Sequence, residues 1–97
     1  MKIWGKEILD RYASKHADIA NALQRWIEFV EEIEWNSHAE LKSDFPTASY
    51  VGNNRYVFDI RGNNYRIVTI VFFISGILKI RFIGTHSEYD KIDCKTI

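Results

Sequence analysis

Residues 65–74 constrain the fold of this chain most, because they are almost continuously apolar and rich in β-branched and aromatic side chains. A strand that is covered on both faces and lies in the middle of a sheet has this composition. Turn signals bound the run, with Gly62-Asn63-Asn64 before it and Ser75-Gly76 after it. The sequence therefore predicts a central strand with a neighbouring strand on each side.

The flanking segments alternate between two faces with the period of a half-buried strand. Within residues 55–61, we expect one face to hold Tyr56, Phe58 and Ile60. After the second turn, we expect Leu78, Ile80 and Phe82 on one face, with Lys79 and Arg81 on the other. Residues 55–85 are thus predicted to form three antiparallel strands.

The N-terminal half has helical periodicity instead. Apolar side chains recur at spacings of three and four from Lys6 to about His16, and again from about Ile19 to Trp35. We expect Asp18 to cap the second helix. The short connection between the two segments predicts a helical hairpin that covers one face of the sheet.

Shorter elements complete the predicted fold. Ser37 is expected to cap a short helix, with Glu40 as its capping-box partner, and the helix should end before Pro46. Residues 48–51 are a candidate strand, and residues 1–4 either pair as an edge strand or simply pack. The length suits one domain over residues 1–97. The predicted class is α+β, with two N-terminal helices on a mostly antiparallel sheet and a short C-terminal helical segment.

Composition narrows the possible functions. The single cysteine, Cys94, excludes an internal disulfide and is read as an incidental thiol near a frayed end. No signal peptide and no apolar run of about 20 residues is present, so a cytoplasmic location is expected. The net charge is zero, but residues 51–97 carry seven Lys or Arg against four Asp or Glu. That excess is compatible with a phosphate-binding face on the sheet.

Titratable and cationic groups concentrate in and after the predicted strands. The three histidines are scattered, and no nucleotide-binding or metal-binding motif is present, so we expect neither a metal nor another cofactor. The groups that remain are Arg61, Arg66, Lys79 and Arg81 on the strands, and His86, Tyr89, Asp90 and Lys91 after them.

This mixture suits cleavage of RNA without a metal. The 2′-hydroxyl needs a base, the pentacovalent phosphate needs cations and the leaving 5′ oxygen needs an acid. Arginine binds phosphate through its rigid donor fork, and histidine can exchange protons near neutrality. Tyrosine can stack on a base or donate a proton.

Simpler interpretations of the same residues stay open. Arg61 and Arg66 flank a turn and can serve only to solvate a strand, or Arg66 can form a salt bridge with Asp59 across the hairpin. Ser87 can cap a helix that has Asp90 at its third position, which would leave His86 as an ordinary surface residue.

Four motifs add a resemblance that spans nearly the whole chain. They are residues 35–46 (WNSHAELKSDFP), 51–58 (VGNNRYVF), 62–68 (GNNYRIV) and 80–92 (IRFIGTHSEYDKI). With these motifs the chain resembles the HigB-type toxins of bacterial type II toxin–antitoxin systems, within the RelE-like superfamily. It departs from the family pattern at residues 59–62, where DIRG adds opposite charges near the turn.

The resemblance implies an mRNA interferase that acts on ribosome-bound message and is inhibited by a cognate HigA-type antitoxin, a helix-turn-helix protein. It implies that His86 and Tyr89 are the leading catalytic residues and that Arg66 and Arg81 hold phosphate. Further RNA contacts are expected from the remaining polar residues, Arg61, Asn64, Lys79, Asp90 and Lys91. Because RelE-like folds also host toxins that poison gyrase, a binding module without nuclease activity is the alternative.

Overall fold

The structure is a computed structural model that describes residues 1–62 and 64–97. Asn63, which the sequence predicts within a turn, lies outside the described residues. The strands are β1 (Lys2–Trp4), β2 (Ser49–Gly52), β3 (Arg55–Ile60), β4 (Tyr65–Phe72) and β5 (Ile77–Thr85). The helices are α1 (Lys6–Lys15), the 3-10 turn η1 (Ala17–Ile19), α2 (Ala20–Glu32), α3 (His38–Asp44) and α4 (His86–Tyr89).

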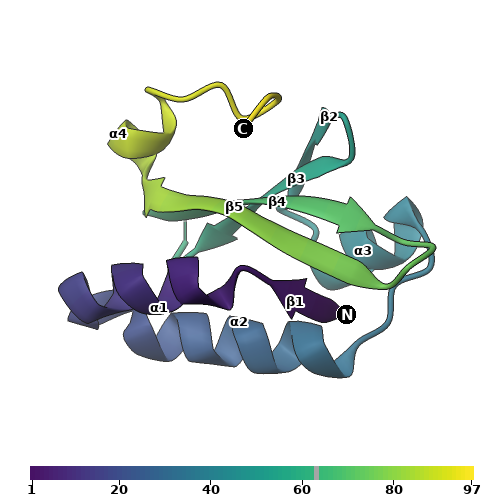
Figure 1. The fold of residues 1–97 in the computed structure, drawn as a ribbon, viewed down its shortest axis with the longest axis horizontal. Coiled ribbons are helices and arrows are strands. Elements are labelled where there is room, and N and C mark those ends of the chain that lie inside the picture. Colours follow the sequence, from purple (N-terminus) through teal and green to yellow (C-terminus); the bar gives the residue numbers. More distant parts are fainter. Residues whose placement is uncertain (63) are drawn as a thin grey trace.

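The described strands form one sheet in the order β1-β5-β4-β3-β2, so β4 is central as its apolar run predicts (Figure 1). β4 pairs antiparallel with both β3 and β5, which confirms the three-stranded prediction. Residues 1–4 supply an edge strand, because β1 pairs in parallel with β5. The α+β class with helices packed on a mostly antiparallel sheet is therefore confirmed.

A β-bulge changes the predicted facing of β5. The register between β4 and β5 shifts at Arg81, since Thr69 pairs with Ile80 whereas Val68 pairs with Phe82. An extra residue reverses the alternation that follows it. Leu78 and Ile80 lie in the core as expected, but Ile83 and not Phe82 continues that face, so the prediction for Phe82 is wrong.

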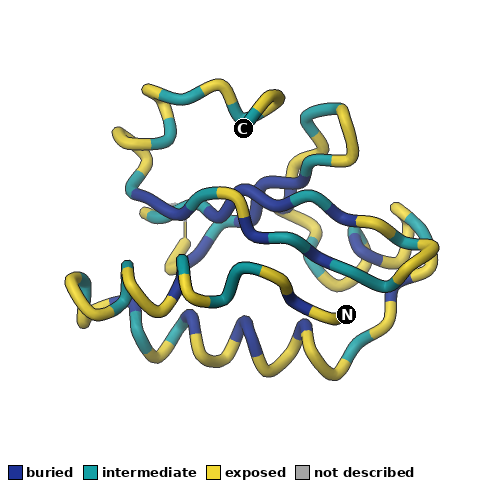
Figure 2. The backbone as a smooth tube through the Cα atoms, in the orientation of Figure 1, coloured by how far each residue is buried: buried dark blue, intermediate teal, exposed yellow. Residues whose placement is uncertain are grey.

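Helices α1 and α2 form the predicted hairpin on one face of the sheet (Figure 1). Their inward sides are buried, as the dark segments in Figure 2 show. Leu23, Trp26 and Val30 of α2 share a core with Phe58 and Ile67 of the sheet. α2 ends at Glu32, earlier than predicted, and Trp35 is buried in the extended segment that follows.

Two of the predicted capping contacts differ in detail. Ser37 caps α3 by accepting a hydrogen bond from Glu40 N, but the Glu40 carboxylate accepts from Asn36 N instead of closing the box on Ser37. The prediction of an Asp18 cap is wrong, because no side chain caps η1 or α2. The Asp18 carboxylate bonds to the sheet instead, as described below.

The opposite face of the sheet carries α4 and the C-terminal segment (Figure 1). Residues 90–97 reach the β2–β3 hairpin, where Arg55 Nη2 and Asn53 Nδ2 donate to backbone oxygens of Ile97 and Lys95 at 2.7 and 3.2 Å. Phe58 and Ile67 face the helices, so their strand neighbours Val57 and Val68 face the other way. Val57 and Val68 are buried on the face that carries α4 and the C-terminal segment. Within the described residues, every helix is too short or too polar to cross a bilayer.

Candidate active site

The candidate site forms where β4, β5 and α4 meet. The strand register sets Arg66 opposite Gly84 and Tyr65 opposite Thr85, and α4 begins at the next residue, His86. A Cβ on Gly84 would lie 2.6 Å from the Phe82 ring and 3.0 Å from Glu88 Cβ. The lack of a side chain at Gly84 therefore lets α4 sit close against the end of β5.

A capping box starts α4 and fixes its position. Thr85 Oγ1 accepts from Glu88 N at 3.2 Å, and Glu88 Oε1 accepts from Thr85 N at 2.8 Å. The alternative interpretation of Ser87 as the cap is therefore wrong, and Asp90 is the residue that ends the helix. Because the box lies at Thr85, His86 and Tyr89 are both within the helical turn.

Glu88 also joins α4 to α1. The Tyr12 hydroxyl donates to Glu88 Oε1 at 2.9 Å. The backbone bond from Thr85, followed by this bond from Tyr12, lowers the pKa of the Glu88 carboxyl. Burial and the same bond raise the pKa of Tyr12. The carboxylate thus connects the strand end, the N-terminal helix and the turn that carries the candidate catalytic residues.

Arg66 is held between a carboxylate and an aromatic ring. Its Nε lies 3.4 Å from Asp59 Oδ1, and its guanidinium carbon lies 4.9 Å from the centroid of the Tyr89 ring. The Arg66 side chain is 22% exposed, and the buried Nε has no hydrogen-bond partner among the described residues. The predicted opposition of Asp59 and Arg66 is confirmed. The arginine is therefore held by Asp59 and Tyr89 with its planar donor fork beside the Tyr89 ring.

Tyr89 is packed under the C-terminal segment. Its hydroxyl donates to Cys94 Sγ at 3.3 Å. Burial, followed by this contact, raises the pKa of Tyr89 to about 12, against the opposing effect of Arg66. The phenol therefore keeps its proton throughout the neutral range. Cys94 is not an incidental thiol, since it holds the hydroxyl of a candidate catalytic residue.

His86 lies at the exposed start of α4. Its Nδ1 is 3.1 Å from Asp90 Oδ2, and both side chains are about half exposed. The backbone N–H of His86 donates to Asn64 O at 3.2 Å, which ties α4 to the end of the β3–β4 turn.

No group of three or more residues suited to a metal occurs in the described ranges 1–62 and 64–97. The His86–Asp90 pair matches a base with a carboxylate that orients it.

Arg61 is not part of this group. It adopts a positive φ of 54° in the turn, and its Nη1 donates to Asp18 Oδ2 at 3.0 Å. Tyr65 donates to the same oxygen at 2.8 Å. The Tyr65 bond, with the Arg61 charge as a weaker contribution, lowers the pKa of Asp18. Arg61 thus joins the hairpin to η1, a structural role that differs from the simple solvation of a strand considered above.

The remaining predicted cations are spread along β5 and beyond. Lys79 pairs with Ile70 of β4, about 13 Å along that strand from Arg66 at a rise of about 3.3 Å per residue. Arg81, at the bulge, lines a groove against α1 together with Arg11 and Lys15. Lys91 is exposed directly after α4. The structure therefore sets Arg66 against Tyr89 and pairs His86 with Asp90 on the same turn of α4, whereas Arg61 is bonded to Asp18 and Arg81 faces α1.

Sequence reasoning missed three contributors to this region. The Thr85–Glu88 box has a readable S/T-x-x-E signature, but Ser87 offered a competing cap two residues later. The contact of Cys94 with Tyr89 and the groove residues Arg11 and Lys15 left no local signal. Both depend on tertiary packing, because the partners come from different elements.

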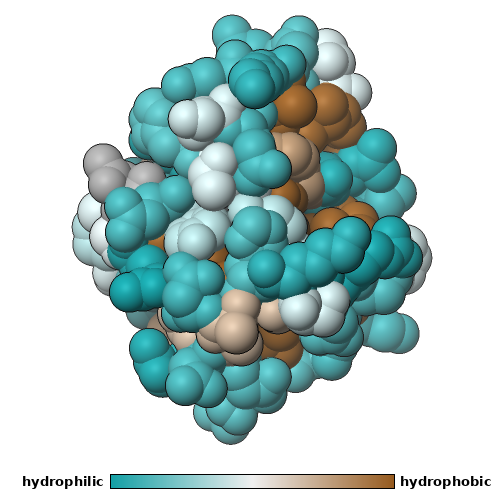
Figure 3. Space-filling view, turned by 90° about the vertical axis from the view of Figure 1, so that its left-hand side faces the viewer, coloured by the Kyte–Doolittle hydropathy of each residue, from teal (hydrophilic) through white to brown (hydrophobic). Residues whose placement is uncertain are grey.

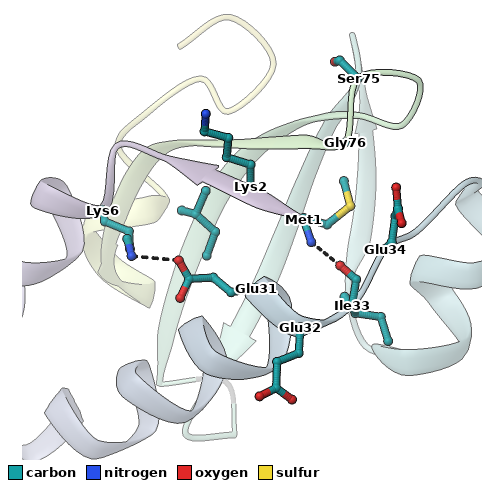
Figure 4. Close-up of a pocket in the computed structure, with 10 residues that line it drawn as sticks. Met1, Lys2, Lys6, Glu31, Glu32, Ile33, Glu34, Ser75 and Gly76 are labelled. Atoms are coloured by element: carbon teal, nitrogen blue, oxygen red, sulfur yellow. Dashed lines mark hydrogen bonds and ion pairs between the residues drawn. The ribbon is translucent and has the colours of Figure 1, made fainter.

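A larger cavity than the groove at Arg81 lies elsewhere, next to β1. It has a volume of about 660 Å³ and lies between the end of α2 and the β4–β5 turn (Figure 4). Its polar groups largely satisfy each other, since Lys6 Nζ bonds to Glu31 at 2.8 Å and the Met1 amino group donates to Val30 O at 2.8 Å and also to Ile33 O. By contrast, the end that carries α4 presents mainly polar side chains with apolar patches between them (Figure 3). Size alone does not identify a site here.

Comparison with known proteins adds independent findings. Residues 19–92 match the family HigB_toxin, described as the RelE-like toxic component of a toxin–antitoxin system. The mRNA interferase HigB of Escherichia coli O6:H1 is 29% identical over 94 residues, which cover 95% of this chain and 91% of that protein. The mRNA interferase toxin HigB of Escherichia coli K12 and mRNA interferase HigB of Shigella flexneri are each 43% identical over 53 residues, about half of either chain.

Proposed function

The chain belongs to the HigB_toxin family, the RelE-like toxic components of toxin–antitoxin systems, and from this premise we propose that it is an mRNA endoribonuclease that works without a metal. Membership implies an antitoxin partner. The relatives are named mRNA interferases, which supports RNA as the substrate. We further propose a HigA-type helix-turn-helix antitoxin, cleavage of message on the ribosome and a cytoplasmic location.

One observation carries the proposal. The Arg66 guanidinium is fixed between Asp59 at 3.4 Å and the Tyr89 ring at 4.9 Å, near the start of β4, which pairs with the end of β5 that leads into the helix of His86. A guanidinium held against the ring of Tyr89, on the helical turn that also carries the exposed imidazole of His86, offers a phosphate-binding fork and a proton acceptor at the same end of the sheet. These are the groups that internal attack on a phosphodiester requires.

The proposed reaction is a transfer within the RNA strand. The 2′ oxygen forms a bond to phosphorus while the bond from phosphorus to the 5′ oxygen breaks. One product ends in a 2′,3′-cyclic phosphate and the other begins with a 5′-hydroxyl. Arg66 stabilises the negative charge that develops on the phosphate oxygens, as preorganised donors do in other phosphoryl transfers.

Each proton has an assigned carrier. Asp90, 3.1 Å from Nδ1, favours the His86 tautomer with its proton on that nitrogen, which leaves Nε2 to accept the proton of the 2′-hydroxyl. Tyr89 keeps its proton because its pKa is about 12, and it is the proposed donor to the departing 5′ oxygen. The phenol would exchange its bond to Cys94 for the substrate, and a thiol sulfur is a weak acceptor.

The other predicted residues are assigned supporting roles. Asn64 and Lys91 flank α4 and are proposed as contacts to the nucleotides next to the scissile bond. Lys79, on β5, is proposed to contact the RNA backbone farther along the strand. Arg61 is engaged by Asp18, so we assign it a structural role in place of the RNA contact expected from the sequence.

Expression in cells tests the biological part of the proposal. We expect induction to arrest growth and to produce discrete new 5′ ends inside translated regions. His86→Ala and Arg66→Ala should remove both effects at equal protein level, because each deletes a group that contacts the reacting atoms. Intact messages during growth arrest would instead favour a toxin that acts on another target.

A further inference from the structure

A second cationic surface lies beside the candidate active site. α1 and β5 enclose a groove with a volume of about 260 Å³. Three cations from the two elements line it, Arg11 and Lys15 from α1 and Arg81 from the bulge of β5. Tyr12 and Phe82 contribute to its aromatic wall. We call this feature the α1–β5 groove.

The three cations have no internal partner. All three side chains belong to exposed residues, and none forms an ion pair or side-chain hydrogen bond within the described part of the chain. Arg11 and Lys15 are four residues apart on one helix, a spacing at which like charges repel and weaken the helix. The nearby carboxylate of Glu88 is already bonded to Tyr12 and Thr85. Lys15 in the last turn of α1 and Glu7 four residues before Arg11 also suit the helix. The ion pairs of the described residues nevertheless leave all three cations available to an anionic ligand.

The groove is continuous with the candidate active site. Tyr12, which lines it, bonds at 2.9 Å to Glu88 of α4, the helix of His86 and Tyr89. Along β5, Arg81 lies four residues before Thr85, about 13 Å in an extended strand. The candidate site and the groove lie on opposite faces of the sheet, and β1 pairs only with Ile77–Lys79 of β5. A polyanion would therefore pass from one to the other over the edge of β5 beyond Lys79.

We propose that the α1–β5 groove binds backbone phosphates of the RNA strand to one side of the scissile bond. This inference rests on RNA being the substrate, as proposed above. Repeated charges along a groove match the repeated phosphates of a nucleic acid, and such contacts position a strand without reading its sequence. Arg81 is then a substrate-binding residue, not a group that acts on the scissile phosphate. The match to the family model begins at residue 19, so it does not include Arg11 and Lys15.

The salt dependence of binding tests this site independently of cleavage. We would measure the Kd of the full chain for a 2′-O-methyl RNA oligomer, which cannot be cleaved, over a range of KCl concentrations. For a single strand, the slope of log K against log salt becomes shallower by about 0.7 for each phosphate that the protein no longer neutralises. The slope should therefore fall by about 1.4 in the double variant Arg11→Ala/Lys15→Ala and by about 0.7 in Arg81→Ala. The control is Arg25→Ala, an exposed cation on α2, which should retain the wild-type slope.

Cleavage kinetics supply the second measurement. With a cleavable oligomer that extends over the groove, we expect the KM of the double variant to be several-fold higher than that of wild type and its kcat to be nearly the same. With a substrate too short to reach the groove, wild type and variant should not differ.

Three results would overturn the inference. The wild-type protein could fail to bind the oligomer, the salt slope could be unchanged in both variants, or the substitutions could weaken binding of the antitoxin while RNA binding stays as in wild type. Binding with the expected slopes but without any cleavage, of message on programmed ribosomes as well as of the free oligomer, would leave the groove intact and refute the proposed nuclease.

Discussion

At the scale of single residues, the surroundings of Arg66 distinguish it from the other predicted cations. Asp59 and the Tyr89 ring restrict its guanidinium, whereas Arg61 is bonded to Asp18. Arg66→Lys keeps the charge but loses the planar fork and its stacking. We expect kcat/KM for RNA cleavage to fall roughly 100-fold or more, with thermal unfolding nearly unchanged. Wild-type kinetics in this variant would show that only the charge matters, and Arg25→Lys provides the matched control.

The two parts of Tyr89 can be separated by substitution. Tyr89→Phe keeps the ring against Arg66 but removes the proton donor, so kcat should fall by roughly 100-fold, within the range typical of general acids, while KM stays similar. Tyr89→Ala also removes the ring and should raise KM in addition. Single-turnover kinetics of the two variants measure the difference. If Tyr89→Phe raised KM as much as it lowered kcat, as Tyr89→Ala is expected to affect both constants, the role of Tyr89 as a proton donor would be contradicted.

Glu88 predicts a dependence of stability on acid pH. Its pKa in the folded chain is lowered from the ordinary value of 4.5 by the bonds from Thr85 and Tyr12. The contribution of the ionised Glu88 carboxylate to folding stability is therefore complete above pH 4.5. It is lost as the pH falls through the pKa that Glu88 has in the folded chain. Glu88→Gln should destabilise the protein at pH 7, by less than about 1 kcal/mol because the group is exposed.

The difference between Glu88→Gln and wild type should shrink as pH drops below 4.5. Urea unfolding at a series of pH values measures it. A constant difference from pH 3 to pH 7 would show that the carboxylate charge has no part in these contacts.

At the scale of elements, the short helix α4 depends on its cap. Thr85→Ala removes the side-chain acceptor for Glu88 N and should cost about 1 kcal/mol of folding stability. It should also lower cleavage, because α4 carries both His86 and Tyr89. Ser87→Ala is the control, since Ser87 is exposed and forms no cap, and it should stay within about 0.5 kcal/mol of wild type. A larger loss of stability in Ser87→Ala than in Thr85→Ala would place the cap at Ser87.

The elements differ in how far the sequence determines them. The central strand, the helical hairpin and the Ser37 cap follow from periodicity and local chemistry, and all three were predictable. The bulge at Arg81 was not, because it arises from the pairing of two strands and leaves no mark in one of them. The cap of α4 was assigned to the wrong residue because Thr85 and Ser87 both satisfy the local rule.

At the scale of the whole molecule, packing decides which cations meet. α1 and α2 cover one face of the sheet, while α4 and the C-terminal segment lie on the other (Figure 1). This division directs Arg61 toward η1 and Arg81 toward α1, and leaves Arg66 beside Tyr89. Sequence reasoning grouped these arginines with residues 86–91 as candidates for RNA binding and left purely structural roles open, because the position of a residue along a strand does not specify the final partner of its side chain.

The chemistry of the RNA ends tests the central claim most directly. A defined RNA would be incubated with purified protein and with ribosomes programmed with that RNA, and both new ends would be identified. We expect a 2′,3′-cyclic phosphate and a 5′-hydroxyl, formed by wild type at a rate at least about 100-fold above that of folded His86→Ala. New 5′-phosphate ends, or full cleavage by His86→Ala, would contradict the assigned site and mechanism.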